Sequence, residues 1–193
     1  LSQKEKSEWN QLFVSFRRSD GKGEVYPLGH LGDLSEGWHH IGFVKKGTGP
    51  DVVAELYVDG ELRFNSRQFI GSLFEEMPRE QRDDFRKRFK EYYTFLDGAG
   101  QQDIVELGST FVQGSQFELA ELRIWTLALD AEEISANSEV ELSGNELGLL
   151  GYYKMNEGVE GTNIEIRNYA HGNAAYNLTL KGDAKWVPFD PTI

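Results

Sequence analysis

Histidines and carboxylates are the side chains that could carry chemistry here, because the 193-residue chain contains no cysteine. That absence excludes thiol catalysis, cysteine-ligated zinc and a disulfide framework. His39 and His40 are neighbours on an expected strand, so their side chains point to opposite faces and cannot bind one metal ion together. His30 and His171 have no ligand-like spacing to the residues near them. We therefore expect structural roles for the histidines.

The acidic residues do not form the pair that glycoside hydrolysis requires. That reaction needs two carboxyl groups facing one cleft, about 5–5.5 Å apart when the configuration is retained. Glu118 and Glu121 lie on one expected strand but face opposite sides of it, and Asp83 and Asp84 lie on an expected helix with solvated side chains. The sequence also lacks a nucleophile elbow, a phosphate loop and a dinucleotide-binding motif. We expect a protein that is not an enzyme.

A basic stripe follows one expected helix, Pro78–Leu96. Pro78 suits the first helical position, and Gly98 is placed to end the helix. The apolar residues at helical spacing are Phe85, Phe89, Tyr92, Tyr93 and Leu96, and the basic residues beside them are Arg79, Arg82, Arg86 and Lys90. These basic side chains either lay their aliphatic stems along the protein while their charges stay in water, or contact an acidic partner or another domain.

The charge balance excludes some classes of partner. The chain has 20 Lys+Arg and 32 Asp+Glu, and its net charge of −12 argues against nucleic-acid binding and against adsorption to anionic membranes. No apolar run reaches the roughly 18 residues of a membrane-spanning helix. Residues Leu1 to Asn10 are polar and do not have the pattern of a signal peptide, and the chain starts with Leu rather than Met, so we expect a piece of a longer protein. A secreted or cell-surface location is expected, and a cytoplasmic one stays open.

The elements that would position these residues are mostly short strands. Short apolar runs between glycine-bearing turns favour a β-sandwich or barrel, and Asp59-Gly60 predicts a tight hairpin. A helical turn is expected at Asp130–Ala136, where Asp130 and Glu133 have capping-box spacing. The expected strands are Gln11–Arg17, Glu24–Leu28, Trp38–Lys45, Val52–Val58, Glu61–Phe64, Asp103–Leu107, Gln116–Trp125, Leu149–Lys154, Asn163–Arg167, Tyr176–Leu180 and Ala184–Val187.

Three stretches together resemble the laminin-G-like, concanavalin-A-like jelly roll of the pentraxin-like superfamily. The first is Gly37–Val44, containing Trp-His-His, followed by the Tyr-Val-Asp-Gly hairpin within Ala54–Leu62. The second is Ala120–Trp125 followed by Ala128–Ile134, and the third is Leu149–Gly158. The resemblance implies an all-β, antiparallel two-sheet jelly-roll sandwich with one inserted α-helix. A single domain would then span residues 1–193, lacking its first strands, with a helical insertion at residues 74–98.

The resemblance also raises calcium binding, because relatives bind this ion at the sandwich rim. Pentraxin-like members carry an acidic cluster after the strand that corresponds to Asp103–Gly108, whereas this chain has Ser109-Thr110-Phe111-Val112 there. Calcium favours six to eight hard oxygen ligands, several of them carboxylates. Asp97, Asp103 and Glu106 remain candidate donors, but we expect no cofactor, with calcium as the open alternative.

Two functions follow from this fold, because function depends on the site rather than on the architecture. The first is a non-catalytic, lectin-like module of a larger protein that recognises a glycan at the sandwich rim. The second is a protein-interaction or structural domain that docks through its sheet edge and inserted helix. Glycan binding would need an exposed aromatic ring, and about half of the late aromatics should face the core. These aromatics are Tyr152, Tyr153, Tyr169, Tyr176 and Trp186.

Overall fold

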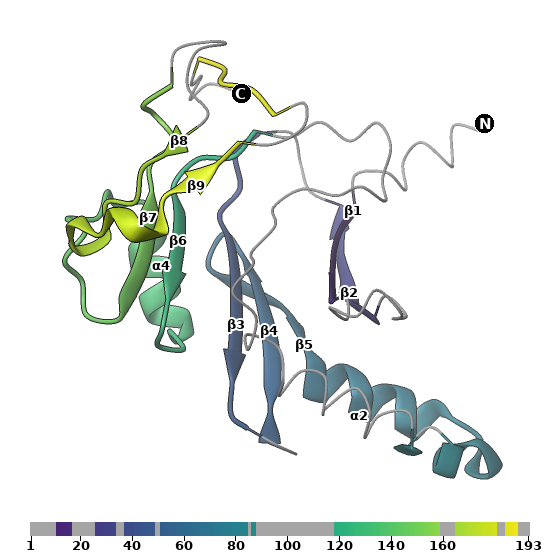
Figure 1. Cartoon of the computed structure of the whole chain (residues 1–193). Coiled ribbons are helices and arrows are strands. Elements are labelled where there is room, and N and C mark those ends of the chain that lie inside the picture. The colour runs from purple at the N-terminus through teal and green to yellow at the C-terminus, as the bar shows by residue number, and fades with distance from the viewer. Residues whose placement is uncertain are drawn as a thin grey trace, which may run out of the picture. The chain divides into compact units, whose positions relative to one another are not determined.

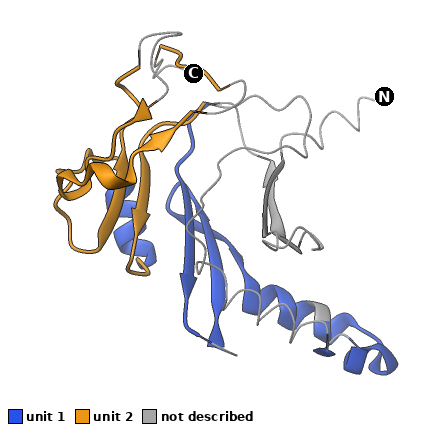
Figure 2. Cartoon of the chain, in the orientation of Figure 1, with its two compact units in different colours: residues 1–104, 130–138 blue, residues 105–129, 139–193 orange. Residues whose placement is uncertain are grey.

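The computed structural model describes residues 11–16, 26–33, 37–48, 51–84, 86–87, 118–158, 165–180 and 184–188 (Figure 1). The chain divides into two compact units, one of residues 1–104 and 130–138 and the other of residues 105–129 and 139–193 (Figure 2). None of the helices in the described ranges has the length and apolarity that crossing a bilayer requires.

The described residues of unit 1 form two small antiparallel sheets. Strands β1 (Gln11–Phe16) and β2 (Tyr26–Asp33) pair with each other, and β3 (Ile41–Lys46), β4 (Val53–Val58) and β5 (Glu61–Asn65) form a sheet in that order. Each of these strands overlaps a predicted one, but β2 ends at Asp33 rather than at Leu28, and β3 begins at Ile41 rather than at Trp38.

The predicted hairpin between β4 and β5 is confirmed. Asp59 and Gly60 both have positive φ angles, 52° and 78°, as a two-residue turn of this kind requires. The Asp59 carboxylate accepts the backbone N–H of His40 at 2.9 Å and lies 2.8 Å from Nδ1 of His39. Burial alone would raise the pKa of Asp59, but the hydrogen bonds from His39 and His40 outweigh it and lower that pKa. The paired histidines thus fasten the chain before β3 to the turn.

Strand β4 is the centre of the unit 1 core, and all six of its residues are buried. Leu56 lies on one face, and Glu55 and Tyr57 lie on the other. The buried Glu55 carboxylate accepts hydrogen bonds from the Tyr57 hydroxyl and the Asn65 amide, each at 2.9 Å, and pairs with Lys46 at 2.7 Å. Because every oxygen has a partner, this acidic residue is compatible with a buried position.

Helix α4 (Ala131–Ser138) packs on the Tyr57 face of this sheet. Ile134 is buried and lies so close to Gly42 that a Cβ at that glycine would sit 3.2 Å from its Cγ2. The predicted capping box is confirmed, because Glu133 N–H donates to Asp130 Oδ1 and Asp130 N–H donates to Glu133 Oε2, both at 2.9 Å. The local sequence therefore fixes where α4 begins.

Tyr57 gives this core a measurable dependence on pH. Burial raises its pKa to about 12, and the hydrogen bond with Glu55 adds to the rise. An unfolded tyrosine loses its proton at about pH 10, so Tyr57 stabilises the folded state below that pH, and this contribution disappears as the pH rises through about 12. We expect a late-titrating phenol in rapid alkaline pH jumps monitored by phenolate absorbance. Tyr57→Phe should reduce that component, whereas Tyr176→Phe should leave it in place; an unchanged late component in Tyr57→Phe would contradict the assignment.

The helical insertion begins earlier than predicted. Helix α2 (Ser66–Glu76) directly follows β5, with the Asn65 side chain accepting the N–H groups of Arg67 and Gln68 as its cap. The predicted helix at Pro78–Leu96 is partly observed as a 3-10 turn at Arg79–Gln81, with residues 82–84 and 86–87 helical. The insertion therefore starts at Ser66 rather than at residue 74, and residues 88–98, including Phe89, lie outside the described residues.

Unit 2 pairs β6 (Leu122–Trp125) with β7 (Leu149–Tyr153), and β8 (Glu165–Ile166) with β9 (Leu178–Thr179). Short 3-10 turns lie at Ala170–Gly172 and Ala174–Tyr176. The predicted strand Gln116–Trp125 is shorter in the described part, because Glu121 has a left-handed φ of 55° just before β6. Residues 184–187, predicted as a strand, form none, and the predicted strand Asp103–Leu107 lies outside the described residues.

The predicted fold is confirmed only in the antiparallel direction of its strands. The described strands are antiparallel, as expected, but they form sheets of only two or three strands and are accompanied by α2 and α4. An all-β description is therefore wrong for the described residues. The antiparallel pairing of β4 with β5 follows from the chemistry of the Asp59-Gly60 turn, which is why the sequence predicts this pair well.

Candidate functional site

Tyr176 is the exposed ring among the late aromatic residues that could support a glycan. Its exposed fraction is 50%, whereas Tyr152, Tyr153 and Trp186 are buried and Tyr169 is half-buried. Tyr176 was predicted to begin a strand, but it ends a 3-10 turn, and β9 begins only at Leu178. A turn position allows the ring to leave the core, and this makes the loop of residues 170–177 the candidate site of unit 2.

The 170–177 loop is held in place by backbone hydrogen bonds. The N–H of His171 donates to the carbonyl of Gly144 at 2.7 Å, and the N–H groups of Asn173 and Asn177 close the two 3-10 turns. The hydroxyl of buried Tyr153 donates to the carbonyl of Tyr176 at 2.7 Å. Because this bond uses the backbone carbonyl of Tyr176, it holds the loop without engaging the Tyr176 side chain.

Asn168 is the buried residue that connects this loop to β7. Its Oδ1 accepts the N–H groups of Tyr152 and Ala170, both at 2.9 Å. Its Nδ2 donates to the carbonyls of Leu150 at 3.3 Å and Asn173 at 3.2 Å. All four hydrogen-bonding positions of this amide are therefore used, and this side chain helps to pre-organise the loop.

The loop exposes polar side chains as well as Tyr176. His171 and Asn173 are exposed together with Tyr176, and Asn173 uses its Oδ1 to accept the N–H of Ala175 at 3.1 Å. His171 also has a left-handed φ of 49°, a conformation that is uncommon for a residue other than glycine. A tyrosine ring has an apolar face, and amide and imidazole groups can form hydrogen bonds, so the loop exposes both kinds of group.

The tyrosines beneath the loop act as hydrogen-bond donors. Burial raises the pKa of Tyr153, and burial followed by the hydrogen bond to Glu121 raises the pKa of Tyr152. Both phenols therefore keep their protons at neutral pH. Glu121, which was predicted to face the side of the strand opposite to Glu118, accepts the Tyr152 hydroxyl at 2.7 Å and pairs with Arg123 at 3.0 Å.

The structure describes three of the four residues of the predicted basic stripe, Arg79, Arg82 and Arg86. Arg82 donates to the carbonyls of Met77 at 3.1 Å and Glu75 at 3.4 Å, and its guanidinium lies 5.0 Å from the centre of the Phe74 ring. Arg86 lies 4.9 Å from the same ring and pairs with Asp83 at 2.9 Å. These two arginines therefore hold the helical insertion together, while Arg79 is exposed and Lys90 lies outside the described residues. The contact role of the stripe stays a prediction.

The metal-binding expectations rest on residues that the structure does not describe. Asp97, Asp103 and Glu106 all lie outside the described residues. Within the described ranges, no group of three or more histidine, aspartate or glutamate side chains is placed to hold a metal ion. Calcium binding therefore stays open.

No family model, curated protein or solved structure matches the chain. The laminin-G-like resemblance consequently stays a prediction that rests on the three sequence stretches.

Proposed function

We propose that this chain is a non-catalytic, lectin-like binding module that recognises a glycan through the 170–177 loop. The observation that carries the proposal is the half-exposed ring of Tyr176 on a loop that Asn168 and Tyr153 hold rigid. A rigid loop loses little conformational entropy on binding, so a weak stacking contact contributes more of its energy to affinity. The proposal includes a jelly-roll sandwich for the whole fold, supported by the order of the three sequence stretches and by the antiparallel pairing.

The proposal is tested by glycan-array binding followed by titration of the best ligand. Tyr176→Ala should weaken binding at least about tenfold, which corresponds to about 1.4 kcal/mol, and Tyr176→Phe should retain most of it. Leu147→Ala is the matched control, because Leu147 is also exposed in unit 2 but lies on a different turn. Equal melting temperatures for all variants would confirm that the loss comes from the site and not from unfolding. Binding that survives Tyr176→Ala unchanged would overturn this assignment.

The structure also supports the alternative, a domain that docks protein through its sheet edge. Among the described strands, β3 has β4 as its one neighbour, and Ile41 and Phe43 on β3 are partly exposed. An edge strand can accept an extended peptide by adding a strand to the sheet. The alternative is favoured if the array shows no ligand while selected extended peptides bind the wild type and not Phe43→Glu.

A further inference from the structure

A lysine ammonium lies near two tyrosine rings in unit 2. Nζ of Lys154 is 5.6 Å from the centre of the Tyr152 ring and 5.1 Å from that of Tyr169. The two rings meet edge to face, with their centres 6.3 Å apart. Cations within about 6 Å of an aromatic ring are attracted by its electron-rich face. Each ring also has a guanidinium near it, that of Arg123 at 5.6 Å from the Tyr152 ring centre and that of Arg167 at 5.0 Å from the Tyr169 ring centre. The two rings therefore form two walls of a cation site whose ammonium is that of Lys154.

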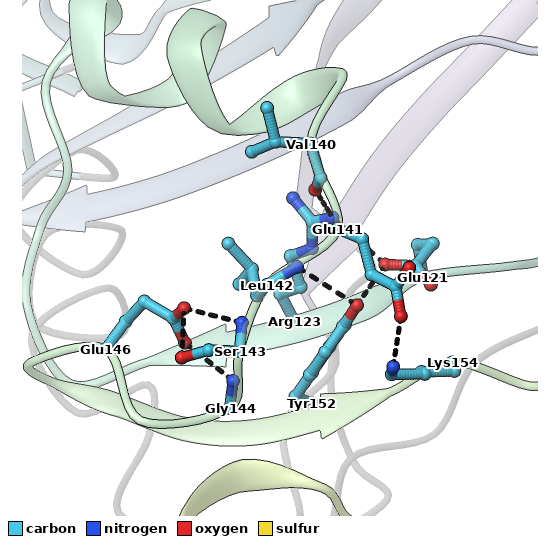
Figure 3. Close-up of polar contacts among 10 residues, drawn as sticks. All are labelled: Glu121, Arg123, Val140, Glu141, Leu142, Ser143, Gly144, Glu146, Tyr152 and Lys154. Carbon is cyan, nitrogen blue, oxygen red and sulfur yellow. Dashed lines mark hydrogen bonds and ion pairs between the residues drawn. The ribbon is translucent and has the colours of Figure 1, made fainter.

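Carboxylates complete the site and strengthen it. Glu141 pairs with the Lys154 ammonium, as Figure 3 shows. The hydroxyl of Tyr152 donates to Glu121 at 2.7 Å, and hydrogen bonds of this kind polarise the donor and enrich its ring in electrons. The pKa of Lys154 is raised, chiefly by its hydrogen bond with Glu141, so its side chain is a cation at neutral pH.

The space between Tyr152, Tyr169 and Glu141 that the Lys154 side chain fills, here called the slot, opens to solvent, because 20% of this side chain is exposed. The aliphatic stem and its ammonium reach the rings from β7, and nothing in the arrangement requires that the ammonium be covalently attached. We propose that Tyr152, Tyr169 and Glu141 form an alkylammonium-binding site that Lys154 occupies from within the chain. A primary alkylammonium ion of similar length takes its place when the Lys154 side chain is shortened.

The proposal is tested by chemical rescue of the full chain. Lys154→Ala should lower the melting temperature, and n-butylammonium chloride should restore it by several degrees in a saturable manner. Sodium chloride at equal ionic strength and n-butanol at equal concentration should restore the melting temperature much less. The salt supplies only charge, and the alcohol supplies only the apolar chain. The wild type should not respond to n-butylammonium, since its slot is filled.

Two further variants separate site binding from a general solvent effect. Lys154→Met fills the slot with an uncharged side chain and should show no saturable response. The double variant Lys154→Ala/Tyr169→Leu lacks one ring and should lose most of the rescue. If Lys154→Ala does not fold alone, refolding in n-butylammonium but not in sodium chloride would support the site. Equal effects of n-butylammonium and sodium chloride on Lys154→Ala, or no refolding with either salt, would overturn the proposal.

Discussion

Asn168→Ala should be among the most destabilising substitutions in unit 2, with a loss of about 3 kcal/mol or more in the free energy of unfolding. Each buried polar group left without a partner costs about 1–3 kcal/mol. This substitution removes the hydrogen-bond partner of four backbone groups, the N–H groups of Tyr152 and Ala170 and the carbonyls of Leu150 and Asn173. Urea unfolding, followed by tryptophan fluorescence and by amide exchange in residues 149–153, measures the effect.

The matched control for Asn168→Ala is Asn145→Ala, which removes the same side chain from an exposed position in the same unit. Substitutions at exposed sites without special roles usually change stability by less than about 0.5 kcal/mol. Similar losses for the two variants would show that Asn168 is not the connection described. Glycan binding should fall together with stability in Asn168→Ala, because the same amide orders the 170–177 loop.

Leu56→Ala should cost about 2–5 kcal/mol, the range observed when a large buried aliphatic residue is truncated in a core. Leu56 lies at the middle of β4 with 1% of its surface exposed, and it pairs with Phe43 on one side and Phe64 on the other. Leu62→Ala removes the same atoms from the neighbouring strand, where the residue is already 44% exposed. It should therefore cost much less.

The comparison of these two leucines is made by urea unfolding at matched protein concentration, with the slope of the transition checked for two-state behaviour. A cost for Leu62→Ala that equals or exceeds that of Leu56→Ala would mean that the centre of the unit 1 core is not where β4 places it.

Features that depend on a few neighbouring residues could be predicted from the sequence. The Asp59-Gly60 turn and the Asp130–Glu133 cap follow from local backbone chemistry, and both are observed. Helix α2 was missed because its cap, Asn65, is also the last residue of β5, so no loop separates the strand from the helix. Gly71, inside α2, further weakens the helical signal.

The candidate site could be predicted only as a set of alternatives. Strand alternation suggests that about half of the late aromatic residues face outward, but it does not identify them. Tyr176 is exposed where the chain turns before β9. Tyr153, 23 residues away in sequence, holds that turn, and Asn168 ties it to Tyr152, which is 16 residues from Asn168. Such long-range hydrogen bonds leave no periodic pattern in the sequence.

The chain passes between its two units three times, after residues 104, 129 and 138. Neither unit can therefore be released by a single proteolytic cut or expressed as one uninterrupted stretch. A fragment ending at residue 104 would lack α4, and with it Ile134, which packs beside Gly42 on the β3–β4–β5 sheet. To study unit 1 separately, a peptide of residues 130–138 would have to be supplied to the truncated chain. Alternatively, the segments would have to be joined in a new order, because no single linker separates the units.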